Sequence, residues 1–195
     1  RGFLGPIFFR KNFSISFVDN NEKIIKILND KKRYTAAFTG KKKYKFVNVE
    51  VERAFNISDK INFEKYDLVF TCVGPKQCYE IAHLFRNAPN IISCENDRNS
   101  VEIIKQISGV KEVYFAIPDV ITSNTAPENL KLQDSLCTVS EQGMLVVEKN
   151  ALDFCNVAKK LKPKDFNMHW HSKFFIHNAP HAMLGKQIPR LLKIL

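Results

Sequence analysis

FSISFVD, residues 13–19, decides the fold of this chain. Its apolar residues first alternate with serines and then run together, which is typical of a buried strand that ends at Asp19. Residues 1–11 before it have the pattern of a helix, and Asn21 opens an apolar stripe that predicts a second helix over 21–29. A helix followed by a strand with an acid at its end is half of a dinucleotide-binding βαβ unit.

Asp19 is the residue on which this interpretation depends. In the dinucleotide-binding unit, an acid about 20 residues beyond a glycine-rich turn binds the ribose hydroxyls of the adenosine. Asp19 falls at that distance if the last glycine of the turn stood just before Arg1, so we expect the first strand and the turn to be missing from this sequence. A carboxylate at this position favours NAD over NADP, because it repels a 2′-phosphate. Alternatively, Asp19 only closes its strand before a turn.

Strands and helices alternate along the following part of the chain. Buried strands are predicted at 67–73, 90–94 and 113–116, and helices at 76–86 and 101–107. Ser100 is the predicted cap of the second helix, and Gly109 ends it. This alternation predicts an α/β fold, a Rossmann-like doubly wound and mostly parallel sheet with helices on both faces.

Two segments interrupt that pattern. Residues 34–57 predict short antiparallel strands, and residues 134–149 predict a pair of strands around Gln142-Gly143. We divide the chain into a Rossmann-like NAD-binding domain at 1–150 and the start of a helical catalytic or substrate domain at 151–195.

Composition narrows the class of protein. The chain has 195 residues of which 45% are hydrophobic, and it has no apolar run near the roughly 20 residues of a membrane span, so we expect no membrane partner. A net charge of +10 suits an anionic partner such as nucleic acid, a dinucleotide or a phosphorylated substrate. We expect no nucleic-acid partner, because no recognition motif accompanies the charge and the basic residues at 31–33 and 41–43 flank a predicted solvated hairpin.

The cysteines indicate the compartment. They are odd in number, lack CxxC spacing and mostly lie inside apolar runs, so we expect reduced core residues in a cytoplasmic protein. The five are Cys72, Cys78, Cys94, Cys137 and Cys155.

An apolar segment from Lys173 to Gly185 carries an amine, a carboxamide and an imidazole. Such groups can take a proton from an alcohol and hold the resulting alkoxide. On a helix, at about 100° per residue, Lys173, Asn178 and His181 lie within an arc of roughly 140°. The same spacing fits an amphipathic helix whose Phe and Leu face the core while these three residues face water.

The spacing Lys173-x4-Asn178-x2-His181 resembles the catalytic signature of the polyol-specific long-chain dehydrogenases. Residues 1–5 and 17–21 are similar to that family's Arg-Gly-Phe-Ile-Gly and Phe-x-Asp-x-Asn segments. Two further motifs match at strand ends: Val73-Gly74-Pro75 is similar to the loop that passes beside the cofactor, and Cys94-Glu95-Asn96 to a motif whose asparagine lies near substrate and nicotinamide. Read without the family, Asn96 is equally a turn residue after a strand.

The resemblance implies a set of site residues. Lys173 would be the base, acting as a neutral amine whose pKa falls from about 10.4 through desolvation, and Asn178 and His181 would donate hydrogen bonds to the alcohol oxygen. The implied NAD-binding residues are Arg1, Gly2, Phe3, Asp19, Asn20, Val73, Gly74, Pro75 and Asn96. The implied substrate-binding residues are Asn96, Asp119, Lys173 and His181.

No metal is expected, although histidines crowd residues 169–181 and some polyol dehydrogenases use zinc. Residues His177 and His181 could supply two zinc ligands, but no HExxH motif or cysteine pair completes a site. Some positions depart from the family pattern: Val120 stands where an arginine follows Asp119, and Ser140, Met144 and Leu145 stand where Val-Glu and Glu-Trp are usual. The substrate pocket is therefore expected to differ from the family type.

Three hypotheses for function remain open at this point. The first is an NAD-dependent polyol or polyol-phosphate dehydrogenase, with mannitol 1-phosphate and fructose 6-phosphate as the best pair. The second is a related hexuronate reductase or mannitol 2-dehydrogenase, and the third is a diverged chain that binds a nucleotide without turnover. We expect the 195-residue chain alone to be inactive, and its oligomeric state is not predicted.

Overall fold

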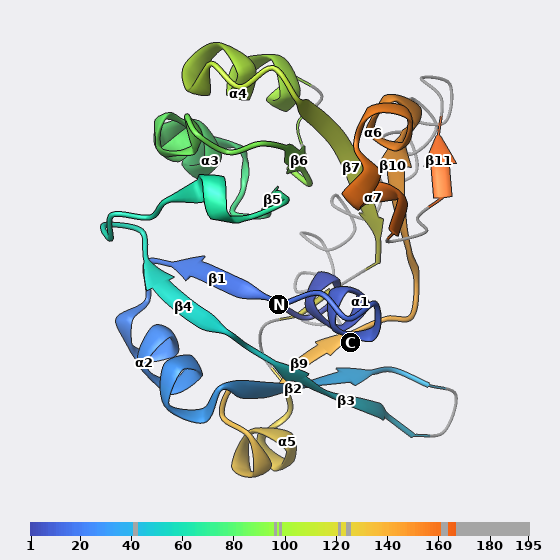
Figure 1. Cartoon of the computed structure of the whole chain (residues 1–195). Coiled ribbons are helices and arrows are strands. Elements are labelled where there is room, and N and C mark those ends of the chain that lie inside the picture. Colours follow the sequence, from blue (N-terminus) through green and yellow to red (C-terminus); the bar gives the residue numbers. More distant parts are fainter. Residues whose placement is uncertain are drawn as a thin grey trace, which may run out of the picture.

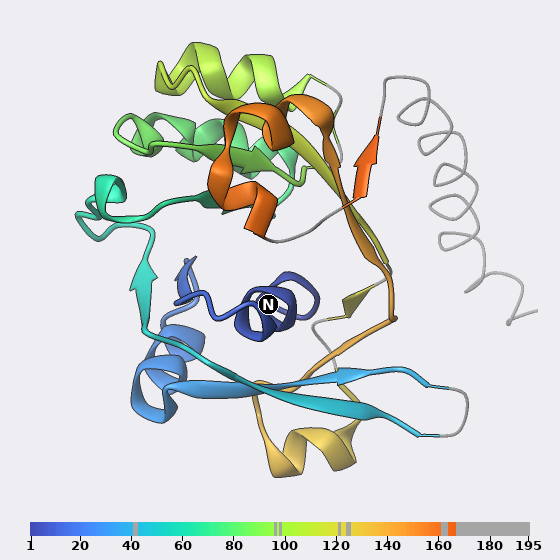
Figure 2. The same cartoon turned by 45° about the vertical axis from the view of Figure 1, so that its right-hand side comes forward.

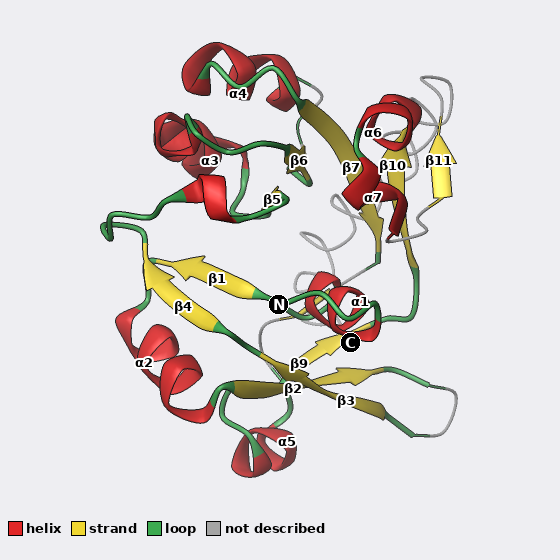
Figure 3. Ribbon diagram, in the orientation of Figure 1, coloured by secondary structure: helices red, strands yellow, loops and turns green. Residues whose placement is uncertain are grey.

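The computed structural model describes residues 1–40, 43–95, 97, 99–120, 122–123, 126–160 and 164–166. The α-helices are α1 Leu4–Arg10, α2 Glu22–Lys31, α3 Pro75–Ile81, α4 Ser100–Ser108, α5 Glu128–Gln133, α6 Lys149–Phe154 and α7 Asn156–Lys160, and the 3-10 helices are η1 Phe63–Lys65 and η2 Ala82–Phe85. The strands are β1 Ser16–Asp19, β2 Arg33–Phe38, β3 Lys45–Glu50, β4 Arg53–Asn56, β5 Val69–Thr71, β6 Ile91–Ser93, β7 Val113–Asp119, β8 Thr122–Ser123, β9 Thr138–Ser140, β10 Met144–Glu148 and β11 Lys164–Phe166. Figure 3 shows how helices and strands alternate.

Two groups of parallel strands adjoin the candidate site, and β2 and β9 form a further parallel pair in a third sheet, of order β3-β2-β9-β8 (Figure 1). In the first group β1 pairs with β4, and in the second β6 lies between β5 and β7, all in parallel. β10 then pairs with β7 in the antiparallel direction, and β11 with β10 in parallel. Helix α1 lies against both groups: its Phe8 ring is 4.7 Å from the ring of Phe70 in β5, and its Gly5 lies beside the ring of Phe17 in β1. The predicted α/β fold with parallel pairing is confirmed.

Helices cover both faces of the second group (Figure 2). Ile91 and Val113 pack with α3, η2 and α4, whereas the next residues along the same strands, Ile92 and Tyr114, belong to the cluster that includes Ala151 of α6. Successive residues of a strand point to opposite faces of its sheet, so each face is apolar and each needs its own helical layer. The predicted arrangement of helices on both faces is confirmed.

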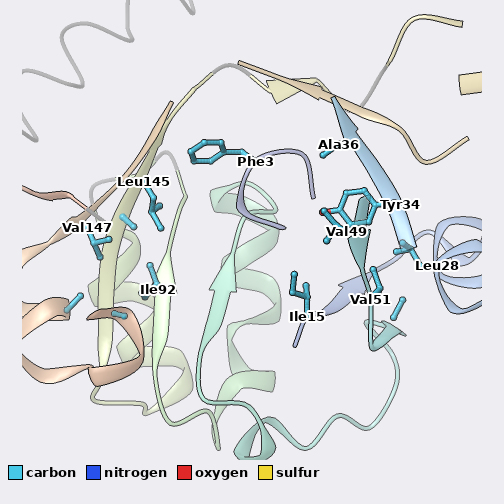
Figure 4. Packing of buried hydrophobic residues seen from close by; sticks show 14 of the residues in the cluster. Phe3, Ile15, Leu28, Tyr34, Ala36, Val49, Val51, Ile92, Leu145 and Val147 are labelled. Carbon is cyan, nitrogen blue, oxygen red and sulfur yellow. The ribbon is translucent and has the colours of Figure 1, made fainter. Parts of the chain in front are cut away.

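The first hydrophobic cluster extends across both groups of strands (Figure 4). It includes Phe3 beside α1, Leu28 of α2, Tyr34 of β2 and Val147 of β10, and of these Leu28 and Val147 are fully buried. One continuous core therefore holds the segments that precede and follow β1 in fixed positions.

Residues 34–57 differ from the prediction in one strand. β2 and β3 form the expected antiparallel hairpin, but β4 pairs in parallel with β1, so the antiparallel prediction is wrong for this last strand. The cause lies in α2, whose Asn29 binds both backbone groups of Ala54 at 2.8 and 2.9 Å. This side chain satisfies the outer edge of β4, and β1 takes the inner edge.

Residues 134–149 contain two strands as predicted, but the strands do not pair with each other. β9 pairs with β2 and β8, whereas β10 pairs with β7 and β11. Between the two strands, Gln142 donates a hydrogen bond to the Thr39 carbonyl at 3.3 Å. The chain therefore crosses from one sheet to the other instead of turning back in a hairpin.

Two of the three predicted helix ends agree with the structure. Asn21 caps α2, and Gly109 ends α4 in the left-handed conformation at φ 75°. The predicted cap of α4 is wrong by one residue: the N-cap is Asn99, and α4 begins at Ser100. The Ser100 hydroxyl instead lies 2.7 Å from the buried hydroxyl of Ser93, so this serine ties α4 to β6.

Replacing Asn21 with alanine is expected to lower the free energy of unfolding by about 1 kcal/mol. The Asn21 side-chain oxygen accepts from the Ile24 amide at 3.2 Å, and alanine leaves this helix-end amide without a side-chain partner. Urea denaturation of the full-length protein measures the change. The matched control is Asn21→Asp, which retains an acceptor and should lose only a few tenths of that amount; equal losses for both variants would contradict the capping role.

Candidate functional site

The carboxyl ends of β1, β5 and β6 hold the residues of interest. From β1 the chain goes on to build β4 on one side, and from β5 it goes on to β6 and β7 on the other. In open α/β sheets, ligands bind outside the carboxyl ends of the strands where the strand order reverses in this way. The residues that follow β1, β5 and β6 are therefore the natural place to look for a ligand site.

Asp19 is the last residue of β1 and is half-buried. One of its carboxylate oxygens accepts from the Asn21 amide at 2.9 Å, and its carbonyl accepts from the Ile57 amide at 3.0 Å. The second carboxylate oxygen has no hydrogen-bond partner among the residues that the structure describes. Asp19 therefore has a fixed position and one free acceptor, and Asn20 beside it is exposed.

The loop Val73-Gly74-Pro75 connects β5 to α3, and hydrogen bonds to Glu95 fix its backbone. The carboxylate of Glu95 accepts from the Val73 amide at 3.1 Å and from the Gly74 amide at 2.8 Å. Gly74 has φ 94°, which L side chains rarely adopt, and Pro75 begins α3. The Val73 side chain is 47% exposed, so the loop turns its amides inward and its side chain outward.

Residues 1–3 lie close to β1. The buried ring of Tyr34 connects them to this strand, because it lies 5.8 Å from the ring of Phe17 in β1. The Arg1 carbonyl accepts from the Tyr34 hydroxyl at 2.7 Å. Gly2 is buried, and Phe3 is 5% exposed and packs in the core. The structure thus places residues 1–3 close to β1, the strand that ends at Asp19.

A family model confirms what this arrangement suggests. The mannitol dehydrogenase Rossmann domain matches residues 1–116, which is more than half of the chain. The chain belongs to the mannitol dehydrogenase family. The predicted family membership is therefore confirmed, and the segments gathered at the strand ends lie within this family's Rossmann domain.

Relatives in the mannitol dehydrogenase family extend the match beyond residue 116. The mannitol-1-phosphate 5-dehydrogenase of Buchnera aphidicola is 32% identical and aligns with 94% of this chain and 54% of its own length. That of Clostridium acetobutylicum is also 32% identical, over 95% of this chain and 55% of its own. The chain spans about half the length of these curated relatives.

Solved structures show the same fold at low sequence identity. Prephenate dehydrogenase from Aquifex aeolicus aligns with a TM-score of 0.61 and 15% identity, covering 99% of this chain and 68% of that one. The ternary structure of D-mandelate dehydrogenase with NADH aligns with a TM-score of 0.59 and 13% identity, covering 83% and 51%. These likenesses confirm the Rossmann-type architecture of this family member.

Several of the predicted site residues lie outside the described part of the chain. These are Asn96, Lys173, Asn178 and His181. Asp119 is the last residue of β7. The roles of all the predicted site residues remain predictions.

Glu95 is the site residue that sequence reasoning missed. The Cys-Glu-Asn motif directed attention to Asn96, yet Glu95 is the side chain that holds the loop. An acid two residues after the short strand β6 was an available signal, because glutamate is almost never fully buried unless it has partners. Here the partners are backbone amides on a different strand end, which no sequence pattern specifies.

Two other features complete the description. Among the described residues, no three His, Cys, Asp or Glu side chains cluster as a metal site would need, and no helix is long and apolar enough to cross a membrane. An open cavity of ≈ 960 Å³ lies at the amino-terminal end of β1. It is lined by residues of α1, β2 and β3 and by Lys31, Lys32 and Asp134, and contains none of the predicted site residues.

Proposed function

We propose that the full-length protein containing this chain is an NAD-dependent dehydrogenase that interconverts a polyol phosphate and a ketose phosphate. Mannitol 1-phosphate and fructose 6-phosphate are the favoured pair, because the family relatives above are named mannitol-1-phosphate 5-dehydrogenases. The observation that carries the proposal is that Asp19 ends β1 and that the 73–75 loop, with Gly74 at positive φ, follows the carboxyl end of β5.

The described residues fit a dinucleotide. The free carboxylate oxygen of Asp19 can accept from a ribose hydroxyl, and its negative charge disfavours a 2′-phosphate, so NAD fits better than NADP. Gly74 keeps the loop backbone close to the site, because it carries no Cβ at its positive φ. We propose that Arg1, Gly2, Phe3, Asp19, Asn20, Val73, Gly74, Pro75 and Asn96 hold NAD, whose nicotinamide accepts a hydride from the substrate carbon.

We propose that the proton chemistry belongs to residues 173–181. Lys173, in its neutral form, takes the proton of the substrate hydroxyl, and the alcohol oxygen becomes the carbonyl oxygen of the ketose. Asn178 and His181 donate hydrogen bonds to this oxygen as negative charge develops on it. Asn96 and Asp119 join Lys173 and His181 in holding the substrate, and the residues need no metal for these steps.

The pairing of β1 and β5 supports a larger sheet in the full-length protein. Among the described strands, β1 pairs only with β4 and β5 only with β6, so one further parallel strand between β1 and β5 would unite both groups in a single sheet. We propose that this strand and the glycine-rich turn after it complete the NAD-binding domain of residues 1–150, and that residues 151–195 begin the helical catalytic domain. The five cysteines are free thiols, which suits the proposed cytoplasmic location.

The test of this proposal is an assay of the full-length protein. NADH formation is followed with mannitol 1-phosphate and with mannitol, and NADH consumption with fructose 6-phosphate and with fructose. Turnover confined to the phosphorylated pair is the expected result. Turnover with the unphosphorylated pair would move the protein to the mannitol 2-dehydrogenase branch, and NADH binding without any turnover would favour a non-catalytic role.

Replacing Asp19 with serine is expected to raise the KM for NAD about 10-fold, because a hydrogen bond to a charged acceptor is lost and a weaker neutral one remains. Activity with NADP, which the carboxylate repels, should rise relative to activity with NAD. Steady-state kinetics with both cofactors measure the ratio. Asp59→Ser is the matched control, since Asp59 is exposed on the turn after β4 and its carboxylate accepts from the Asn56 amide there. An unchanged cofactor ratio in Asp19→Ser would contradict the assignment.

A further inference from the structure

We propose that Glu95 is a positioning residue for the cofactor: its carboxylate fixes the backbone of Val73 and Gly74 in the shape that receives NAD, without touching NAD itself. This proposal rests on the proposed function, because the 73–75 loop matters to the reaction only if a dinucleotide binds there. It adds a residue that the family resemblance left without a role.

The burial of Glu95 requires an explanation. Its side chain is 2% exposed, and burying a carboxylate is costly unless hydrogen bonds replace its water. The two loop amides supply one bond to each carboxylate oxygen, at 3.1 and 2.8 Å. Neither ion pair among the described residues includes Glu95. The compensation for this buried charge therefore comes from the loop itself, so the carboxylate and the loop stabilise each other.

Glu95 is the rigid partner in this arrangement. The β5–β6 ladder continues to its neighbour, because the Cys94 amide donates to the Thr71 carbonyl at 3.0 Å. The Glu95 amide donates to the Ser93 hydroxyl at 3.4 Å, and that hydroxyl is bonded to Ser100 of α4. The loop, in contrast, contains Gly74, whose backbone has the most freedom to change. Because β6 and α4 fix the position of Glu95, its carboxylate restricts the backbone of the loop to one conformation.

The thiol of Cys78 strengthens this view. It lies on α3, directly after the loop, and is fully buried. Burial is the main reason that the pKa of Cys78 rises to about 12, and the charge of Glu95 adds to the rise, so the thiol stays neutral and adds no second negative charge beside this carboxylate.

The amide directions explain why Glu95 acts through the loop. Both N–H groups point to the carboxylate, and the Gly74 carbonyl accepts from the Cys78 amide at 2.9 Å in the first turn of α3. These groups are not available to a ligand, whereas the Val73 side chain is 47% exposed. If the two hydrogen bonds to Glu95 are lost, the amides can rotate, and the surface that the loop presents to NAD changes.

The experiment compares Glu95→Gln, Glu95→Asp and wild type in the full-length protein. In Glu95→Gln one oxygen becomes an NH₂ group that cannot accept from an amide, so one charge-assisted bond is lost, and the Kd for NADH and the KM for NAD should rise roughly 10- to 100-fold. The KM for the polyol substrate and kcat should change less than about 3-fold, because binding alone is affected. Glu95→Asp retains the charge and should recover part of the NADH affinity.

The control is Glu80→Gln, the same change at an exposed position on α3, which should leave all constants unaltered. Wild-type NADH affinity in Glu95→Gln would overturn the role of Glu95 while leaving the proposed function intact. If wild type binds no dinucleotide, the proposed function fails and this proposal fails with it. Should Glu95→Gln not fold, Glu95→Asp decides: weakened NADH binding at unchanged kcat supports the proposal, and unchanged binding overturns it.

Discussion

Replacing Lys173 with alanine should lower kcat of the full-length protein by roughly 10²- to 10⁴-fold, the range expected when a general base is removed. Hydride transfer from the alcohol carbon requires that the hydroxyl proton leaves, and in the proposed mechanism only the neutral Lys173 amine accepts it. The variant should bind NADH with wild-type affinity, because the proposed NAD-binding residues lie elsewhere. Steady-state assays measure the loss of turnover, and the enhancement of NADH fluorescence on binding measures the retained affinity.

A sharper form of this test adds a small primary amine to the assay. If Lys173→Ala lacks only a base, the added amine should restore part of the activity, and more of it at higher pH, where more of the amine is neutral. Lys160→Ala is the matched control, since Lys160 is exposed at the end of α7 and should be unnecessary for turnover. Equal activity of Lys173→Ala and wild type would exclude Lys173 as the base and require another residue for it.

Residues 13–21 illustrate what sequence reasoning can reach. The alternation that ends at Asp19 and the cap at Asn21 are local signals, and the structure has both the strand β1 and the capped helix α2 at those positions. The helix 101–107 and its end at Gly109 are local in the same sense. Hydrophobic period and capping chemistry depend on neighbouring residues only, so one sequence is enough to read them.

Strand pairing could not be read in the same way. Nothing near Ala54 indicates that Asn29 binds its outer backbone edge, and nothing near Gln142 indicates that β9 and β10 join different sheets. Both depend on partners far along the chain, and hydrophobic alternation is the same for parallel and antiparallel neighbours. The contacts of Glu95 could not be predicted for a related reason. Its partners are backbone amides about 20 residues earlier, and every residue except proline has such an amide.

The close approach of Gly5 to Tyr34 leads to the second large prediction. Gly5→Ala should lower the free energy of unfolding by about 3 kcal/mol, at the upper end for overpacking. A Cβ on Gly5 would lie 1.9 Å from the Tyr34 hydroxyl oxygen, far inside contact distance. The tyrosine cannot move aside easily, because it is 1% exposed and its hydroxyl donates to the Arg1 carbonyl at 2.7 Å. The gain of alanine over glycine in helix α1, about 1 kcal/mol, is too small to offset this.

A double-mutant cycle with Tyr34→Phe identifies the cause. Tyr34→Phe alone removes the hydrogen bond to Arg1 and should cost about 1 kcal/mol. In the double variant the clashing oxygen is gone and the nearest ring carbon lies 3.3 Å from the new Cβ, a tight contact that small shifts can relieve. The double variant should therefore be more stable than the sum of the two single losses predicts, by at least about 1 kcal/mol in urea denaturation. Strict additivity would mean that the alanine disturbs α1 in some other way. A positive coupling would show that Gly5 is required because it leaves room for the Tyr34 hydroxyl, the group that donates to the Arg1 carbonyl.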